Sequence, residues 1–230
     1  MNTTLLFSIY YGMTGVEFVI LIPFLLQFKN LDIPSRCLFY YILSSLVFAG
    51  GSAILQHLSL NNMWFFSLMH FIQFVILSIF YRYCIKNPVV KNIILFVPIA
   101  VLAIFIFDLF YIEGPRAYNS ISSGVKHVVL ITYGIYLFMQ MLRDKELIEN
   151  AVYINTLPEF WYNAAIFVFA CTEFFFSISY NYLQSLQTSG PGKMKTTMAI
   201  LSINYIVGMV SMILLYIGLT KLKKTRYANS

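Results

Sequence analysis

The fold is decided by the stretch Asn61–Asn87, which reads NNMWFFSLMHFIQFVILSIFYRYCIKN. From Met63 to Ile79 its residues are almost all apolar or aromatic. About twenty such residues in a helix, at 1.5 Å of rise per residue, cross the roughly 30 Å of bilayer hydrocarbon. His70 and Gln73 lie three residues apart in this stretch, so they share one face of the helix. Because hydrocarbon penalises polar side chains, we expect this face to point into protein or water.

The composition of the chain indicates a membrane protein. Hydrophobic residues make up 60% of the 230 residues and charged residues only 10%, and the mean hydropathy is +0.77. This balance lies outside that of soluble domains. The formal net charge is +6, but the basic residues lie between apolar runs and at the C-terminus, where they contact lipid headgroups and set topology. We therefore expect membrane lipid, and no nucleic acid, as a partner.

Six further apolar runs have membrane-spanning length. Charged or turn-forming residues separate the runs, as at Glu113-Gly114-Pro115. Nothing outside the runs is large enough to fold alone, so we predict a single transmembrane domain over residues 1–230. The predicted fold is an all-α bundle of seven membrane-spanning helices. The predicted spans cover residues 5–28, 37–56, 63–81, 89–111, 122–142, 158–183 and 196–219.

The distribution of basic residues predicts the orientation. With the N-terminus outside, the cytoplasmic connections and the C-terminus hold eleven of the fifteen Lys and Arg residues, and the outer side holds four. Because cytoplasmic loops carry an excess of Lys and Arg, we predict an outer N-terminus and an inner C-terminus in the cytoplasmic (inner) membrane. The four outer residues are Arg116, Lys126, Lys193 and Lys195.

Polar residues inside the predicted helices lie mostly at or outward of the membrane midplane. Ionisable residues at such depth usually face a bundle interior or a cavity and pair with one another. We therefore predict an outward-facing polar pocket for a small ligand, with no catalytic group, metal or cofactor. The predicted pocket residues are Glu17, His70, Gln73, Glu173 and Asn204, with His57, Asp108, Lys126, His127 and Trp161 as secondary candidates.

These residues also have structural interpretations. Glu17 or Glu173 with a neutral His70 would make an interhelical hydrogen bond that fixes packing. Such a pair would make the thermal stability depend on pH near the ordinary histidine pKa of about 6.5. Asp108 and Lys126, like His127, lie close enough to the outer interface to be hydrated.

A metal site is chemically possible but lacks a motif. His57, His70 and Asp108 carry suitable ligand atoms. No HxxxH or HExxH spacing places two ligands on one helix, however. A zinc-dependent, lipid-modifying membrane enzyme is therefore only the third interpretation of the chain.

Three pairs of predicted spans show a weak internal repeat, and in one pair the first and fifth spans share Tyr11-Gly12 and Tyr133-Gly134. The second span reads FYYILSSLVFA from Phe39 and the sixth reads FWYNAAIFVFA from Phe160, with aromatic residues at the same first three positions. In the third and seventh spans, His70 then corresponds to Asn204. Three spans, one linking span and three more would form a parallel duplication, as in one class of transporters. A small-solute transporter is therefore the alternative function.

Two segments carry a resemblance to a family. The segment NNMWFFSLMHFIQFVILSIFY resembles uncharacterised bacterial seven-helix proteins, in which a His is followed three residues later by an acid or amide and then Phe. The segment LPEFWYNAAIFVFACTEFFF is similar to their sixth span. Gln73 stands where the resemblance implies Glu, which argues against a proton relay there. The family in turn resembles the seven-helix sensor regions found joined to, or beside, signalling kinases. The residues that carry the resemblance are Asn61, His70, Gln73, Phe74, Tyr81, Leu157, Pro158, Phe160, Trp161 and Asn163.

Two better-known seven-helix classes do not fit the last span. A retinal-binding rhodopsin needs a Schiff-base Lys in the middle of this span, and Thr196–Leu219 contains none. The membrane hydrolases that resemble ceramidases need a His-x-x-x-His there, and the span contains no His.

The leading interpretation is a receptor-like or sensory module that binds a small ligand or a lipid headgroup in the outward-facing pocket. We expect it to signal through a cytoplasmic or membrane partner such as a kinase. The candidate contact regions are the charged loop Arg143–Asn150 and the basic tail Lys221–Arg226.

Overall fold

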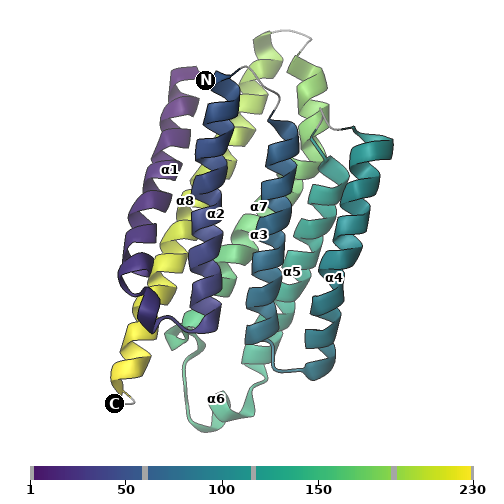
Figure 1. The fold of residues 1–230 in the computed structure, drawn as a ribbon. Coiled ribbons are helices and arrows are strands. Elements are labelled where there is room, and N and C mark those ends of the chain that lie inside the picture. The colour runs from purple at the N-terminus through teal and green to yellow at the C-terminus, as the bar shows by residue number, and fades with distance from the viewer. Residues whose placement is uncertain (1–2, 59–61, 115–117, 188–190, 229–230) are drawn as a thin grey trace.

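The structure is a computed structural model of the chain, and all of its regular elements are helices. It describes residues 3–58, 62–114, 118–187 and 191–228, with their side chains within 8–179 and 200–222. No strand occurs among the residues described. The long helices stand side by side in one bundle, with connections at both ends (Figure 1).

Within these residues, seven helices are long and apolar enough to cross a membrane, which confirms the predicted all-α fold with seven spans. Their apolar segments are Ser8–Leu26, Ile33–His57, Met63–Cys84, Pro88–Ile112, Ser120–Leu142, Pro158–Ser179 and Ile200–Leu222. The long helices are α1 (Thr3–Leu26), α2 (Ile33–His57), α3 (Met63–Cys84), α4 (Pro88–Phe107), α5 (Ser120–Leu142), α7 (Pro158–Gln187) and α8 (Pro191–Ala228). The short elements are the 3₁₀ turn η1 (Phe28–Asn30), the π-helical turn η2 (Asp108–Ile112), α6 (Lys145–Glu149) and the 3₁₀ turn η3 (Ile154–Thr156).

The second helix begins earlier than the expected residue 37. Asp32 caps it, because its side chain accepts a hydrogen bond of 3.0 Å from the backbone N–H of Ser35. Pro34 lies in the first turn, where its missing N–H costs nothing. The Asp-x-Pro sequence that looked like the end of a loop is therefore the start of α2.

The helices form a ring that follows the chain (Figure 1). Each helix packs on the next in the order α1, α2, α3, α5, α7 and α8, and α8 packs on α1 to close the ring. Helix α4 packs on α3 and α5. The bundle has an N-terminal end, where α1 begins, and an opposite end, where α6 and the C-terminus lie.

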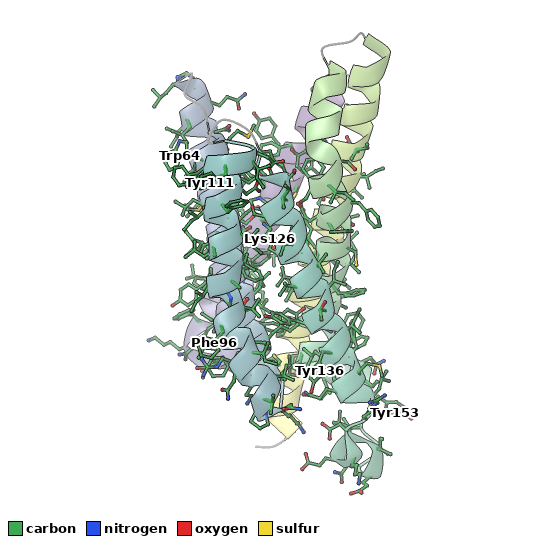
Figure 2. The ribbon with its side chains drawn as sticks, turned by 90° about the vertical axis from the view of Figure 1, so that its right-hand side faces the viewer. Trp64, Phe96, Tyr111, Lys126, Tyr136 and Tyr153 are labelled. Carbon is green, nitrogen blue, oxygen red and sulfur yellow. The ribbon has the colours of Figure 1, made fainter. Side chains whose placement is uncertain are left out.

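Exposed aromatic side chains lie near both ends of the bundle (Figure 2). Trp64 and Tyr111 lie toward the N-terminal end and are 49% and 77% exposed. Tyr153 lies at the opposite end and is 77% exposed. Trp and Tyr are enriched at the two membrane–water interfaces. Side chains of this kind at both ends of the bundle therefore fit helices that cross the membrane from one end of the bundle to the other.

In the half of the bundle that lies toward α6 and the C-terminus, hydrogen bonds join three helices. The Tyr81 hydroxyl of α3 donates to Oδ1 of Asn163 in α7 at 2.9 Å. The Asn163 amide donates to the carbonyl oxygen of Gly134 in α5, also at 2.9 Å. All three residues are buried. Since lipid tails are as apolar as a helix surface, such bonds and close packing at small residues hold membrane helices together.

Helices α7 and α8 approach closely at Gly218. A Cβ atom there would lie 2.4 Å from Cε1 of Tyr162 and 3.1 Å from the carbonyl oxygen of Pro158. Tyr162 is 1% exposed, and its hydroxyl lies 3.1 Å from Oγ of Ser35, so the ring has little room to move.

We expect Gly218→Ala to lower the free energy of unfolding by about 1–3 kcal/mol, because overpacking forces side chains and backbone apart. The measurement is the midpoint of thermal unfolding in detergent. Gly50→Ala is the matched control, since nothing lies within 4 Å of a Cβ there. Its gain in helix propensity should raise the stability by roughly 0.5–1 kcal/mol. Equal midpoints for the two variants would contradict the close approach at Gly218.

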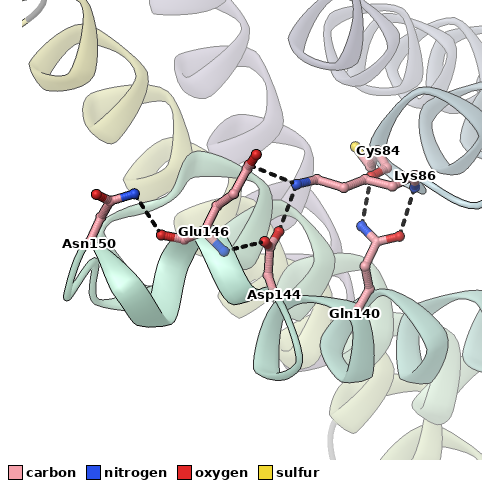
Figure 3. Close-up of polar contacts among 6 residues, drawn as sticks. All are labelled: Cys84, Lys86, Gln140, Asp144, Glu146 and Asn150. Atoms are coloured by element: carbon pink, nitrogen blue, oxygen red, sulfur yellow. Dashed lines mark hydrogen bonds and ion pairs between the residues drawn. The ribbon is translucent and has the colours of Figure 1, made fainter.

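Polar contacts fasten the α3–α4 connection to the end of α5 (Figure 3). The Gln140 side chain accepts a hydrogen bond from the backbone N–H of Lys86 at 2.7 Å and donates to the carbonyl oxygen of Cys84 at 3.1 Å. Lys86 Nζ lies 2.8 Å from Asp144 and 3.5 Å from Glu146. This end of the bundle therefore has a fixed arrangement of charged groups.

The Lys86–Asp144 pair should give the protein a pH-dependent stability. The hydrogen bond and opposite charge of Lys86 lower the pKa of Asp144, and Asp144 in turn raises the pKa of Lys86. The Asp144 contribution is therefore present above the unfolded value of about 3.9 and is lost as pH falls through the lower folded pKa. The Lys86 contribution is present below about 10.4 and is lost as pH rises through the higher folded pKa.

We expect the difference in unfolding midpoint between the wild type and Asp144→Asn to be constant from about pH 5 to 9 and to be lost as the pH falls through the lowered pKa of folded Asp144. It should also shrink in high salt, because the pair lies at the surface. Thermal unfolding at a series of pH values in detergent measures the difference. A difference that persists at the acid end would mean that Asp144 acts through its cap on α6 rather than through Lys86.

Candidate functional site

The centre of the N-terminal half of the bundle holds a buried lysine. Lys126 lies about two turns into α5, is 6% exposed, and lies among the helices in Figure 2. Its Nζ is 2.5 Å from Nδ1 of His70 in α3. The His70 ring stacks on Phe66 at 4.2 Å between ring centroids. Of the carboxylates that the structure describes, none lies within 4.0 Å of Lys126.

A network of hydroxyl groups lies next to this pair. His127 Nδ1 is 3.4 Å from Oγ of Ser177 in α7. Ser177 is 3.0 Å from both Ser123 Oγ and the Tyr118 hydroxyl, and Tyr118 donates to Ser123 at 2.8 Å. All four residues are buried, so the network joins α5 to α7 in the interior of the protein.

Two carboxylates form local pairs on other helices. Glu173 of α7 accepts a 2.6 Å hydrogen bond from the Asn204 amide of α8. Its second oxygen and the Asn204 Oδ1 have no hydrogen-bond partner in the described part of the chain. Glu17 of α1 accepts a 2.7 Å bond from Ser45 of α2. Glu173 lies close enough to Lys126 to attract it, though beyond 4.0 Å.

Two other carboxylates cap the start of α5. Asp108 accepts a 3.0 Å hydrogen bond from the backbone N–H of Ser122, and Glu113 accepts one of 2.5 Å from the N–H of Ser120. The Ser120 hydroxyl also donates to Glu113. Carboxylates at a helix N-terminus satisfy its free N–H groups and its dipole. Asp108 is fully buried, so its role as a helix cap replaces the expectation that it is hydrated at the interface.

Two small cavities adjoin the Lys126–His70 pair, which lines both of them. Each has about 20 Å³ of space for water centres, and roughly 10–15 Å³ of such space holds one water molecule. Both atoms of the Asn119 side chain, which lines the first cavity, lack a hydrogen-bond partner. The first cavity lies between α3, α4 and α5, and its polar lining consists of Ser67, His70, Tyr118, Asn119, Ser122, Ser123 and Lys126. The second lies between α2, α3, α5 and α7, and its polar lining consists of Tyr41, His70, Gln73, Lys126 and His127.

The structure brings together part of the predicted pocket. His70 and Gln73 line the second cavity with Lys126 and His127, which had been secondary candidates. Lys126 and His127 are only 6% and 4% exposed, so the interpretation that they are hydrated at the outer interface is wrong. His70 pairs with this lysine rather than with a carboxylate.

The other predicted residues line neither cavity. Glu173 and Asn204 form their own pair, and Glu17 lies at the α1–α2 contact. His57 is exposed at the end of α2. Trp161 lies toward the opposite end, where its Nε1 donates to the carbonyl oxygen of Asn155 at 2.8 Å. In the part of the chain that the structure describes, no three His, Cys, Asp or Glu residues form a metal-binding group.

The sequence-based prediction included His70, Lys126 and His127 but missed the other polar residues of the first cavity and of the hydroxyl network, which are Ser67, Tyr118, Asn119, Ser122, Ser123 and Ser177. A signal for them exists at the start of α5, where Ser122, Ser123, Lys126 and His127 recur at helical spacing and share one face. Tyr118, Asn119 and Ser177 carry no comparable pattern.

Fold and site together define a seven-helix integral membrane protein with a buried polar centre at Lys126 and His70. Comparison with protein-family models, with curated proteins and with solved structures finds no match to this chain. The function therefore has to follow from the geometry of the site.

Proposed function

We propose that the chain is a receptor-like or sensory module of the cytoplasmic membrane that binds a small anion in the cavities beside the Lys126–His70 pair and signals through a partner protein. The observation that carries this proposal is a nearly fully buried lysine next to two cavities, without a described carboxylate within 4.0 Å. A buried charge is stable only when it is paired and hydrogen-bonded. A bound anion would supply the missing charge.

The neighbouring acids each accept a hydrogen bond from another group, although Glu173 keeps one oxygen without a partner among the described residues and attracts Lys126 from beyond 4.0 Å. Glu173 accepts from Asn204, Glu17 from Ser45, and Asp108 caps α5. The cavities admit one or two waters each, which limits the anion to a halide ion or a small carboxylate such as formate or acetate. The Asn119 amide, which has no hydrogen-bond partner among the described residues, is a suitable second donor.

Signalling requires that the anion bind differently to two arrangements of the helices. Lys126 and His70 belong to α5 and α3, and the same two helices are joined at the opposite end by Gln140. A change in the distance between α3 and α5 would therefore reach the loop Arg143–Asn150. An outer N-terminus, in agreement with the excess of basic residues at the opposite end, makes this loop and the Lys221–Arg226 tail available to a cytoplasmic partner such as a kinase.

The test is thermal unfolding of the purified protein in sodium salts of chloride, formate, acetate and gluconate at equal ionic strength. Binding to the native state stabilises it by RT ln(1 + [L]/Kd), about 2.7 kcal/mol at one hundred times Kd. We expect at least one small anion to raise the midpoint above that in gluconate, and Lys126→Met to abolish the rise. Lys29→Met, at an exposed lysine, should keep it. Equal responses of wild type and Lys126→Met would refute the site.

A small-solute transporter is the second candidate, supported by the pattern of helix contacts. In a repeat of three, one and three spans, α1, α2 and α3 correspond to α5, α7 and α8. The contact of α3 with α5 then corresponds to that of α8 with α1, and both contacts occur. Anion flux into liposomes that is lost in His70→Ala and Asn204→Ala would favour transport. Saturable binding without flux would favour the receptor.

A further inference from the structure

A third cavity lies at the end of the bundle opposite to Lys126, away from the anion site proposed above. It is an open groove of about 320 Å³ between the α3–α4 connection and the end of α5. The groove residues are Lys86, Tyr136, Met139, Gln140, Arg143, Asp144 and Lys145.

The groove carries more positive than negative charge. Three of its residues are cations and one, Asp144, is an acid. The acid is paired with Lys86 at 2.8 Å. Arg143 and Lys145 are exposed, and no acidic group among the described residues lies within 4.0 Å of either side chain. These two cations are therefore available to an anionic ligand.

The position of the groove along the helices places these charges at the membrane boundary. The apolar segment of α5 ends at Leu142, directly before Arg143. Lys86 lies in the short connection between the segments that end at Cys84 and begin at Pro88. Charges just beyond the hydrocarbon lie at the level of phospholipid headgroups.

The apolar side of the groove continues into the bilayer region. Met139 and Tyr136 lie one and two turns before Arg143 on the same side of α5. Ile135, Met139 and Leu142 are exposed on α5, with exposed fractions of 50%, 41% and 58%. A ligand with a negative headgroup and apolar chains would match both parts, whereas a soluble phosphate would use only the charged part.

We propose that this groove binds an anionic phospholipid. Its phosphate would be held by Arg143 and Lys145, and its acyl chains would lie along the exposed face of α5. The planar guanidinium group of Arg143 suits phosphate, to which it donates two parallel hydrogen bonds. The two hydrogen bonds of Gln140 and the Lys86–Asp144 pair fix the walls of the groove (Figure 3). The site is thus formed before the lipid binds, which reduces the entropic cost of binding.

The experiment titrates the full chain in a neutral detergent with phosphatidylglycerol, phosphatidylcholine or sodium phosphate, and follows thermal unfolding and the number of lipids retained in native mass spectrometry. We expect phosphatidylglycerol alone to raise the midpoint and to be retained. The variant Arg143→Gln/Lys145→Gln should weaken its binding at least about tenfold, since one hydrogen bond to a charged group contributes enough for that factor. Arg143→Lys/Lys145→Arg should largely restore binding.

The control variant is Lys29→Gln/Arg82→Gln, which removes two exposed cations that the groove does not include. It should bind phosphatidylglycerol as the wild type does. Equal losses in the two double variants would mean unspecific attraction and would overturn the proposal. So would equal stabilisation by phosphatidylcholine, or a response to sodium phosphate of the same size. The retained-lipid count decides the outcome even where a variant is less stable.

Discussion

Replacing Lys126 by Met should make the protein more stable while it abolishes the response to small anions. Met keeps the length and apolar part of the side chain but removes a cation that is 6% exposed. Taking an ion out of water costs several kcal/mol, whereas a hydrogen bond from a charged group, such as that to His70, contributes about 1.5–3 kcal/mol. We expect a net gain of about 1–3 kcal/mol, and each kcal/mol raises the midpoint by roughly 2–4 °C in a protein of this size.

The gain in stability tests the buried charge separately from ligand binding. Thermal unfolding in gluconate measures the protein without a small anion, and Lys29→Met, at an exposed position, should leave the midpoint unchanged. A loss of more than about 2 kcal/mol in Lys126→Met would mean that attraction to Glu173 outweighs desolvation. Lys126 would then be a structural ion-pair partner, and the anion site would lose its main support.

A buried lysine such as Lys126 lowers the stability of the protein while it serves ligand binding. Protein interiors tolerate uncompensated charge where function needs it, and the cost is carried by contacts elsewhere. In this chain those contacts lie toward the opposite end, where Tyr81, Asn163 and Gly134 join three helices. The N-terminal half of the bundle, by contrast, contains the two small interior cavities and several polar atoms without partners among the described residues.

The seven spans could be predicted from the sequence because the thickness of the hydrocarbon sets the length of each helix. Met63–Cys84 was visible as an apolar run between polar residues, and the structure has a helix over this range. The start of α2 was missed because Asp32 and Pro34 occur in turns as well as in helix caps. Local sequence does not distinguish a turn from a helix cap at these residues, and the packing of α2 decides between the two structures.

The pairing of polar residues could be predicted only in part. His70 was recognised as an interior residue, but its partner is Lys126 rather than an acid. Partners depend on how each helix is rotated about its axis. In a soluble protein the apolar stripe of a helix shows which side faces the core. Here the lipid-facing side is as apolar as the core, so the sequence does not indicate the rotation of a helix. Ser123 and Ser177 were missed because serine costs little in a membrane helix, where its hydroxyl can also bond to its own backbone.

The second large effect is expected at the buried pair of α7 and α8. Asn204→Leu should lower the free energy of unfolding by about 1–3 kcal/mol, since it removes the 2.6 Å hydrogen bond that Glu173 accepts. The other oxygen of Glu173 already lacks a partner, and the residue is 5% exposed, so water cannot replace the lost bond. The measurement is again the midpoint of thermal unfolding in detergent.

A double-mutant cycle separates this pair from simple packing. Glu173→Met/Asn204→Leu should recover most of the loss, because an apolar pair of similar volume leaves no buried acceptor unpaired. Asn92→Leu, at an exposed position of α4, controls for the change from Asn to Leu and should have little effect. A double variant that is as unstable as the sum of its single variants would mean that Glu173 and Asn204 contribute independently. The Glu173 carboxylate would then be stabilised chiefly by Lys126. Glu173 itself would supply the negative charge next to Lys126, so a bound anion would not be needed there.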